Sequence, residues 1–358
     1  MIKNKRKKIA ILAPVGNTIP PQKQGGIEWM VYYLVENFVK KGYKVLLFAP
    51  DGTKTSAELI PVGPKSIGKY KILPEYEKAR KLRLELSALS NMFAEILKRK
   101  EEIGIIFNHT VSGGMFSPLE KILGVPVFHI LHLPLFKELA DVFEKYNARL
   151  ISISNNQRKL FPDLNYQSTV YNGINLEKFS FSEKSGDYFI FSGKITPAKN
   201  PLGAIKAVKT VKEKLILVGR INDEKYFKTK IKPLLNKNII YLGEVSFSKM
   251  INLYKNAKAF LFPIQWQEPF GLVMIEAMAC GTPVVAFKKG SVPEVVVNGK
   301  TGFVVNNEEG MINAIKKIDQ INRKQCRKHV EEKFSLEKMI DGYEEIYREI
   351  SKSQAALK

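Results

Sequence analysis

The sequence predicts an α/β protein made of two Rossmann-like domains that face each other across a cleft. Its 358 residues exceed what one compact core usually holds. Short apolar runs alternate with amphipathic segments, which is typical of parallel strands covered by helices on both faces. The series starts twice, on either side of a polar segment at residues 180–186. Because ligands of such sheets bind beyond the carboxyl ends of the strands, we expect the site in the cleft.

The first domain is expected at residues 1–180. Continuous apolar runs predict strands at residues 9–13, 44–49, 103–108, 126–131, 149–154 and 168–171. Apolar side chains at helical spacing predict helices at residues 27–40, 82–100 and 113–123, with Gly42 ending the first. Residues 56–81 are basic and follow neither period, so they predict no defined element.

The second domain is expected at residues 184–335. The same signals predict strands at residues 188–192, 214–218, 239–242, 259–262 and 283–287. They predict helices at residues 201–211, 248–255, 272–280 and 308–318. A final helix, at residues 336–352, follows.

The charge is strongly unbalanced, with 57 Lys and Arg against 35 Asp and Glu, a formal +22. Such a chain attracts polyanions, which include nucleic acids, anionic lipid headgroups and phosphorylated substrates, so charge alone selects no partner. Basic clusters lie at residues 3–8 and 65–83. These clusters could contact an anionic membrane or a phosphorylated acceptor. They could equally form a solvated charged face, and the sequence leaves both interpretations open. No stretch interleaves aromatic and basic residues as an RNA-binding sheet does, so we expect no nucleic-acid partner.

The remaining composition favours a cytoplasmic protein, soluble or peripheral on the inner face of the membrane. Cys280 and Cys326 form no C-x-x-C pattern and predict neither a disulfide nor a zinc site. The apolar run at residues 9–13 ends at Pro14 and is too short for a signal peptide. No run reaches the length of a membrane span.

The most informative stretch is Glu268-Pro-Phe-Gly-Leu-Val-Met-Ile-Glu276. Gly271 precedes an apolar helix, and a helix start carries unpaired N–H groups and partial positive charge, so an anion can approach closely there. Glu268 lies before that point, and Glu276 lies roughly 7 Å along the helix axis beyond it. Carboxylates on either side of a bound anion would accept hydrogen bonds from hydroxyls. The arrangement matches a sugar, a diphosphate and a ribose in a row.

This stretch and its surroundings resemble the retaining GT-B glycosyltransferases of family GT4 (glycosyl transferase group 1). The similarity covers residues 262–286, continues through Gly290-Ser-Val-Pro-Glu-Val-Val and Gly299-Lys-Thr-Gly-Phe303, and extends over most of the chain. It implies a GT-B fold whose C-terminal helix packs back on the first domain. It also implies that Glu268 bonds the donor sugar and Glu276 the ribose. The backbone implied to contact sugar and phosphate is that of Phe270, Gly271 and Leu272.

Two further segments resemble donor-binding loops of the same family. Lys194 and Lys199 lie where the family's G-R-x-x-x-x-K-G loop holds the diphosphate, although Lys194 replaces the usual Arg and Asn200 the usual Gly. A lysine is a point charge without the fork of Arg, which makes Lys199 the firmer contact. The base is expected near Gly243 and Val245. In the family that contact is made largely by the backbone, so the sequence does not distinguish uracil from guanine. A UDP-hexose is expected as the donor because it is the most frequent donor in the family.

On the acceptor side, Gly25 and Gly26 end the first loop at a helix start. They resemble the family's loop that approaches donor phosphate and acceptor, although a glycine pair can also serve only the turn. His132 follows a strand where the family has a histidine touching the donor sugar. His109 also follows a strand and is a weaker candidate, whereas His129 lies within its strand as a core residue. No G-x-G-x-x-G occurs, which argues against a dehydrogenase.

The resemblance implies transfer of a hexosyl group to a hydroxyl acceptor with retention, one candidate acceptor being lipid-linked in cell-envelope glycan or glycolipid synthesis. No carboxylate is evident as a nucleophile, so positioning and electrostatics are expected to carry catalysis. Asp-x-Asp, the usual metal-binding motif of other glycosyltransferases, is absent, so we expect metal-independent activity and no cofactor. The alternatives are another GT-B enzyme (a sugar-nucleotide epimerase or a glycogen-synthase-like enzyme), a degenerate partner subunit, or a basic nonenzymatic nucleic-acid-binding protein.

Overall fold

The computed structural model describes residues 7–21, 25–63 and 77–356, and the chain forms two compact units. Unit 1 contains residues up to 153, residues 158–170 and residues from 340 onward. Unit 2 contains residues 154–157 and 171–339. The division at residue 170 comes earlier than the expected linker at residues 180–186, so residues 171–180 belong with the second unit. Within the described residues, no helix is both long and apolar enough to cross a membrane.

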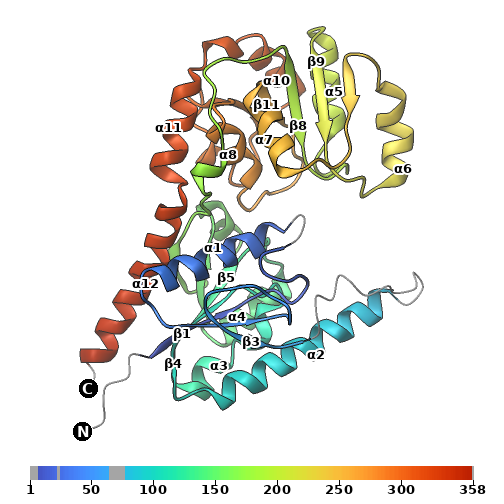
Figure 1. Cartoon of the computed structure of the whole chain (residues 1–358). Helices are drawn as coiled ribbons and strands as arrows, with labels where there is room; N and C mark the ends of the chain where they lie inside the picture. Colours follow the sequence, from blue (N-terminus) through green and yellow to red (C-terminus); the bar gives the residue numbers. More distant parts are fainter. Residues whose placement is uncertain (1–6, 22–24, 64–76, 357–358) are drawn as a thin grey trace. The chain divides into compact units, whose positions relative to one another are not determined.

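Unit 1 is built on a parallel sheet (Figure 1). Within the described residues its seven strands lie in the order β3-β2-β1-β4-β5-β6-β7. The strands are β1 (Lys8–Leu12), β2 (Val45–Ala49), β3 (Glu58–Pro61), β4 (Ile103–Asn108), β5 (Val127–Leu131), β6 (Arg149–Ser152) and β7 (Tyr166–Thr169). The chain proceeds outward from β1 to β3 and then returns to β4 on the other side of β1. The carboxyl ends of β1 and β4 therefore flank the switch point where such sheets bind ligands.

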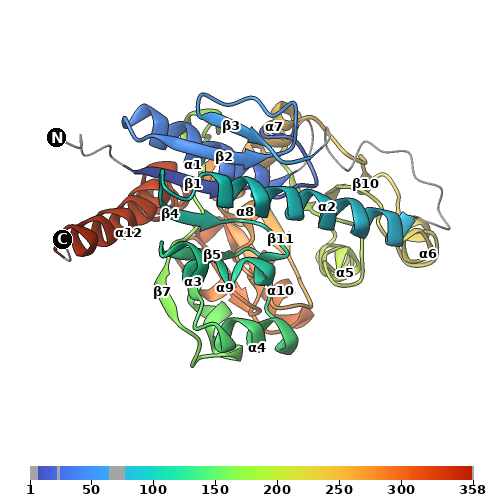
Figure 2. The same cartoon turned by 90° about the horizontal axis from the view of Figure 1, so that it is seen from below.

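Helices cover both faces of this sheet. They are α1 (Gly26–Lys40), α2 (Glu77–Lys98), α3 (Leu119–Leu123), α4 (Lys137–Lys145) and α12 (Leu336–Ala356), with a 3-10 turn η3 (Gly113–Phe116). A second 3-10 turn, η4 (Asn155–Leu160), has its first residues in unit 2. Residues of α2 and α3, among them Leu89, Met92 and Leu119, form one core with β1, β2 and β4. On the other face Phe38 of α1 and Tyr343 of α12 both pack on Phe107 of β4. Figure 2 shows α2 as a long helix that begins beyond the strands of the sheet and runs toward β4.

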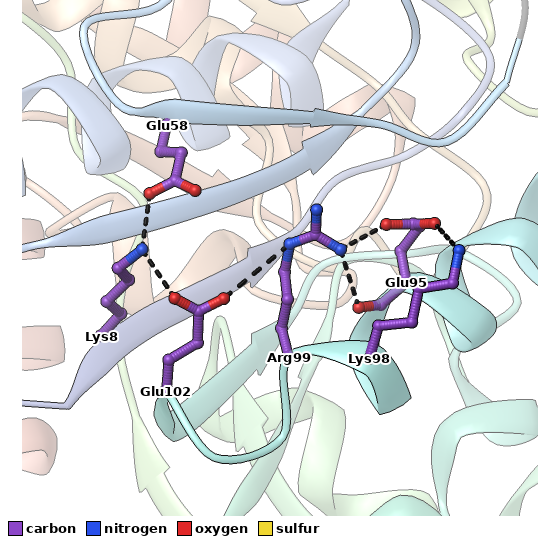
Figure 3. Close-up of polar contacts among 6 residues, drawn as sticks. All are labelled: Lys8, Glu58, Glu95, Lys98, Arg99 and Glu102. Carbon is purple, nitrogen blue, oxygen red and sulfur yellow. Dashed lines mark hydrogen bonds and ion pairs between the residues drawn. The ribbon is translucent and has the colours of Figure 1, made fainter.

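A chain of ion pairs ties the amino edge of this sheet together (Figure 3). Lys8 Nζ lies 2.6 Å from Glu58 Oε2 and 2.8 Å from Glu102 Oε2. Arg99 continues the chain from Glu102 to Glu95. Lys8, which the sequence placed in a basic cluster, is therefore a paired residue and not a free surface charge. Residues 3–6 and 65–76 of the two basic clusters lie outside the described residues.

Unit 2 repeats the architecture with a six-stranded parallel sheet in the order β10-β9-β8-β11-β12-β13 within the described residues. The strands are β8 (Tyr188–Ser192), β9 (Lys214–Val218), β10 (Ile239–Tyr241), β11 (Ala257–Phe262), β12 (Val284–Phe287) and β13 (Gly302–Val305). The main helices are α5 (Pro201–Thr210), α7 (Phe247–Lys255), α8 (Leu272–Ala279), α10 (Glu308–Ile315) and α11 (Arg323–Lys333). Shorter turns are η5 (Leu176–Lys178), α6 (Glu224–Tyr226), η6 (Phe227–Ile231), η7 (Lys232–Leu234), α9 (Val292–Val295) and η8 (Ile318–Gln320). The order reverses between β8 and β11, which marks the switch point of this unit.

Several elements differ from those expected. The helix expected at residues 113–123 is wrong, because the chain forms η3 and then α3, with Pro118 between them. Proline lacks the N–H that a continuous helix needs. Strand β3 was not expected, since it is a short edge strand of which only Ile60 is buried. Elements α4, α11 and β13 were also not expected.

Candidate functional site

The start of α8 is built so that its backbone is approachable. Gly271 precedes the helix with φ 80°, a conformation that favours glycine, and no side chain caps the helix start. A Cβ at this position would lie 2.7 Å from Met274 Cε. Phe270 and Met274, which flank this turn in the sequence, are buried. The predicted contact residues Phe270, Gly271 and Leu272 therefore lie at an uncapped, positively polarised helix start.

The segment around Gly290 braces the loop that carries Glu268. Ser291 donates its backbone N–H to Glu268 O at 2.9 Å and its hydroxyl to Phe270 O at 2.7 Å. Gly290 donates its N–H to the side chain of Gln267 at 2.8 Å. A Cβ at Gly290, which has φ 56°, would lie 2.2 Å from Glu268 O. This contact explains in physical terms why a glycine stands at position 290.

Glu268 and Lys199 form an ion pair. Lys199 Nζ lies 2.5 Å from Glu268 Oε2, to which the Trp266 indole N–H also donates at 3.0 Å. The ammonium stands 4.9 Å from the centre of the Trp266 ring, a cation–π contact. Glu268 is only 8% exposed, so its carboxylate is shielded from bulk water, whereas Lys199 is half-buried. The structure thus brings together two residues that the sequence assigned to different parts of a donor.

The structure explains why Asn200 can replace the glycine that usually follows the loop lysine, here Lys199. Its backbone is left-handed, with φ 55°, and its side-chain oxygen accepts the N–H of Gly203 at the start of α5. Its amide donates to Pro263 O at 2.9 Å. Asparagine is one of the few residues that adopts this conformation at low cost. The replacement of the usual glycine therefore preserves the backbone that positions Lys199.

Glu276 lies within α8 and is half-buried. Desolvation raises its pKa from 4.5 to about 7. Within the described residues its side chain has no hydrogen-bond partner. The carboxyl is therefore free to accept hydrogen bonds from a ligand's hydroxyls, and its charge depends on pH near neutrality.

Lys194 has a cationic neighbour that the sequence did not single out. Ser192 pairs with Val218 in the β8–β9 register, and the register continues to a bridge between Ile195 and Ile221. Lys194 and Arg220 are therefore opposite each other, about 5 Å apart at the backbone. Both side chains are exposed, and neither charge has an ion-pair partner in the described part of the chain. Two adjacent unpaired cations form a local anion-attracting feature.

Glycines let the backbone segments beside this pair approach one another closely. Gly219 follows β9, and a Cβ there would lie 1.9 Å from Gly193 O, so the two backbones meet closely. The Gly219 N–H donates to Gly243 O at 2.9 Å. Gly243 has φ 71° and open space where a Cβ would stand. Gly243, predicted near the base, thus lies beside the carboxyl end of β9. Val245, predicted with it, is half-buried.

In unit 1, Gly25 and Gly26 lie at the start of α1. A Cβ at Gly25 would lie 2.8 Å from Glu28 Oε2, and Glu28 is buried and accepts a hydrogen bond from Asn17 at 2.8 Å. The helix start thus already faces one carboxylate of its own chain. A phosphate contact at these glycines stays a prediction.

His132 and His109 form a pair at the carboxyl ends of β5 and β4. His109 Nδ1 lies 2.9 Å from His132 Nε2, with ring centroids 5.1 Å apart and ring planes inclined by 29°. Burial lowers the pKa of His132 to about 4 and that of His109 well below its usual range, so both are neutral at neutral pH. His129 is buried within its strand, as expected for a core residue.

The predicted residues of each unit lie in segments that follow the strands, and Lys199 and Glu268 are in direct contact. In unit 2 they gather at the start of α8 and at the carboxyl ends of β8, β9 and β10; in unit 1, Gly25, Gly26 and His132 follow β1 and β5. The sequence did not single out Trp266, Ser291 or Arg220. Arg220 could have been found as a cation directly after a strand, in Leu-Val-Gly-Arg. Among the described residues, no group of three or more His, Cys, Asp or Glu side chains could hold a metal ion.

Two family models match the chain and together span most of it. Residues 174–333 match the model "Glycosyl transferases group 1", and residues 24–178 match "Glycosyltransferase Family 4". The first match contains Lys194, Lys199, Glu268 and Glu276.

Curated relatives are similar over part of their length. A glycosyltransferase of Methanocaldococcus jannaschii is 31% identical over 195 residues, which are 51% of this chain and 53% of the relative. The O-antigen chain mannosyltransferase RfbU of Salmonella typhimurium is 32% identical over 43% of this chain and 44% of the relative. The N-acetyl-alpha-D-glucosaminyl L-malate synthase of Bacillus anthracis is 32% identical over 40% of each chain. The chain therefore spans about half the length of these relatives or less.

Solved structures share the fold over nearly the whole chain. A sucrose-phosphate synthase from Thermosynechococcus elongatus is similar with a TM-score of 0.77 at 21% identity, over 97% of this chain and 100% of the other. Anabaena HepE in complex with UDP-glucose is similar with a TM-score of 0.70 at 18% identity, over 98% and 100%. With both parallel-sheet units and both family models in agreement, the chain belongs to the GT4-type glycosyltransferases of the GT-B fold.

Proposed function

We propose that this protein transfers a hexosyl group from a UDP-sugar to a hydroxyl acceptor, with retention and without a metal ion. The observation that carries the proposal is the Lys199–Glu268 pair, which joins the loop before α5 to the loop that leads to the uncapped start of α8. A cation, a shielded carboxylate and free backbone N–H groups together complement a phosphate beside a sugar. The complex of Anabaena HepE with UDP-glucose supports the choice of a UDP-sugar, and the mannosyltransferase RfbU supports transfer of a hexosyl group.

The side chains then have separate tasks. Glu268 accepts hydrogen bonds from hydroxyls of the transferred sugar, and Glu276 accepts them from the ribose. Lys199, Lys194 and Arg220 stabilise the negative charge that grows on the diphosphate as the glycosidic bond breaks, aided by the start of α8. The departing phosphate oxygen takes the acceptor's proton, and the sugar is attacked on the face that the phosphate leaves. Three cations and a helix start would neutralise the leaving group without a metal.

Two more specific proposals concern the acceptor and the cellular site of the reaction. We propose a lipid-linked acceptor used at the inner face of the membrane. The support is α2, on which Leu82 and Leu86 are 56% and 47% exposed beside the exposed Arg83. Apolar and cationic side chains on one exposed helix suit an anionic lipid surface. Sedimentation with vesicles containing an anionic lipid should retain the protein, and vesicles of neutral lipid alone should not.

The donor proposal is tested by thermal shift with UDP-, GDP- and ADP-sugars, with and without EDTA. A ligand that binds the native state raises the melting temperature by mass action. We expect a shift with UDP-sugars that EDTA leaves unchanged and that Glu276→Ala reduces. A shift only with another nucleotide would overturn the choice of base, and a shift lost in EDTA would overturn metal independence. Retention on DNA without any sugar-nucleotide shift would favour a nonenzymatic binding protein.

A further inference from the structure

The four histidines of this chain differ in what their ring nitrogens contact. His109 is 1% exposed, and its Nε2 is enclosed without a hydrogen-bond partner among the described residues. Its other nitrogen, Nδ1, lies 2.9 Å from His132 Nε2. His132 is only half-buried, and its Nδ1 is neither enclosed nor bonded within the described residues. The pair therefore has one closed end, at His109, and one open end, at His132.

A 2.9 Å separation between two ring nitrogens requires that one carries a proton and the other a lone pair. Both rings are neutral at neutral pH, because burial disfavours the charged forms. Each neutral ring has a single N–H, so only two arrangements exist. Either His109 Nδ1–H donates to His132 Nε2, or His132 Nε2–H donates to His109 Nδ1.

The enclosed nitrogen decides between them. If His132 donated, the proton of His109 would lie on Nε2 and leave a buried N–H without an acceptor. If His109 donates, Nε2 keeps only a bare lone pair. Orphaned buried donors are the rarest unsatisfied groups in folded proteins, and they cost the full desolvation of the N–H. His109 is therefore the donor, and the proton of His132 must lie on Nδ1.

We propose that His109 is a positioning residue that locks His132 as the Nδ1–H tautomer, so that the open end of the pair presents an N–H and no lone pair. A ring in this state donates a hydrogen bond to an oxygen but accepts no proton through Nδ1. His132 is thus a donor to a ligand oxygen and not a general base. That the oxygen belongs to the donor sugar rests on the proposed function, whereas the tautomer lock does not.

The lock is tested by 15N NMR of the imidazole rings at neutral pH, which distinguishes Nδ1–H from Nε2–H. Two other histidines are internal controls. Asn108 Nδ2 donates to His129 Nδ1 at 3.0 Å, with the amide oriented by Thr110, so His129 carries its proton on Nε2. His329 Nε2 lies 3.0 Å from Val295 O and must also carry the proton. We expect Nε2–H for both controls and Nδ1–H for His109 and His132. An Nε2–H tautomer at His132 would overturn the proposal.

Two variants separate the lock from packing alone. His109→Asn places an amide near the position of Nδ1 and can still donate, whereas His109→Leu fills the space without a donor. We expect His132 to remain Nδ1–H in His109→Asn and to lose that preference in His109→Leu. Sugar-nucleotide affinity should fall roughly ten-fold in His109→Leu, with UDP affinity unchanged, and recover in His109→Asn. Equal affinities in both variants would overturn the functional part.

The outcomes also separate this inference from the donor proposal. A locked His132 in a protein that binds no sugar nucleotide would contradict the proposed function and leave the tautomer lock standing. A protein that binds sugar nucleotides with His132 as Nε2–H would contradict the tautomer lock and leave the proposed function standing. If His109→Leu does not fold, the comparison of wild type with His109→Asn still reports the tautomer directly.

Discussion

Lys199 Nζ and Glu268 Oε2 are 2.5 Å apart, so the free protein pairs a cation with the carboxylate that we propose for the transferred sugar. A bound diphosphate would compete with Glu268 for the same ammonium. A bound sugar would in turn offer Glu268 hydroxyl donors in place of that ammonium. Donor binding therefore exchanges one set of charged contacts for two, which favours a ligand that carries both phosphate and sugar.

The variant Glu268→Gln should separate these two effects. Removing the carboxylate charge releases Lys199 for phosphate, so we expect UDP to bind at least as tightly as to the wild type. The amide is a weaker acceptor for sugar hydroxyls, so turnover with the UDP-sugar should fall roughly ten- to hundred-fold. Calorimetry with UDP and steady-state transfer kinetics measure the two quantities. Loss of UDP binding in Glu268→Gln would contradict the exchange.

Donor affinity should depend on pH through Glu276. Its pKa is raised to about 7, and only the ionised carboxylate is a strong acceptor for ribose hydroxyls. Affinity for a UDP-sugar should therefore rise as pH rises through 7 and fall about ten-fold one unit below the pKa. A sugar nucleotide is the right probe because its diphosphate does not titrate in this range. Glu276→Gln is the control, and its affinity for the UDP-sugar should not change with pH in this range. An affinity of the wild type that does not change with pH would contradict the prediction.

The same pKa shift acts on stability with the opposite sign. The folded protein binds more protons than the unfolded chain between pH 4.5, the ordinary value, and about 7. The Glu276 contribution to the free energy of unfolding is therefore present at low pH and lost as pH rises through this window. His132, with its pKa lowered to about 4, contributes stability that is lost as pH falls from its ordinary 6.5. The two groups together favour the folded state most at intermediate pH.

Arg220 should contribute to phosphate binding and not to base binding. Its backbone stands opposite Lys194, and neither charge is paired within the described residues. Arg220→Met should weaken UDP binding roughly ten- to hundred-fold and leave uridine binding unchanged. Lys209→Met is the matched control, since Lys209 is an exposed cation in the last turn of α5. Equal losses with UDP and uridine would place Arg220 at the base instead.

The sequence predicted the interior of each sheet better than its edges. Strands β4, β8 and β9 have the expected bounds because they are apolar runs in the middle of a sheet. Strand β3 lies at an edge and buries one residue, and α4 buries only Ala140 and Phe143. Neither segment contains enough apolar residues to show a recognisable strand or helix periodicity in the sequence.

The site shows the same division between local and long-range information. The turn at Gly271 and the start of α8 are local, and the sequence predicted both. The brace from Ser291 to Glu268, the opposition of Lys194 and Arg220, and the contact of His109 with His132 all join segments distant in the chain. Such contacts depend on strand register and side-chain rotamers, which no motif spacing reports.

The C-terminal helix should be required for the stability of unit 1. Tyr343 is 2% exposed and packs edge-on against Phe107, with centroids 5.5 Å apart, and lies beside His109. Glu344 accepts hydrogen bonds from Lys41 and from Tyr43, whose hydroxyl lies 2.6 Å away. Tyr343→Ala should lower the free energy of unfolding by about 3–5 kcal/mol, as for other large aromatic deletions in cores.

Tyr343→Phe is the matched control, because it keeps the ring and should change stability little. Two units need not unfold together, so a single transition should not be assumed. Hydrogen exchange resolved by residue separates them: the loss in Tyr343→Ala should appear in β1, β4 and α1, while β8 to β13 keep their protection. Uniform loss over both units would show that α12 stabilises the whole chain. An unchanged pattern would contradict the role assigned to the Tyr343 ring.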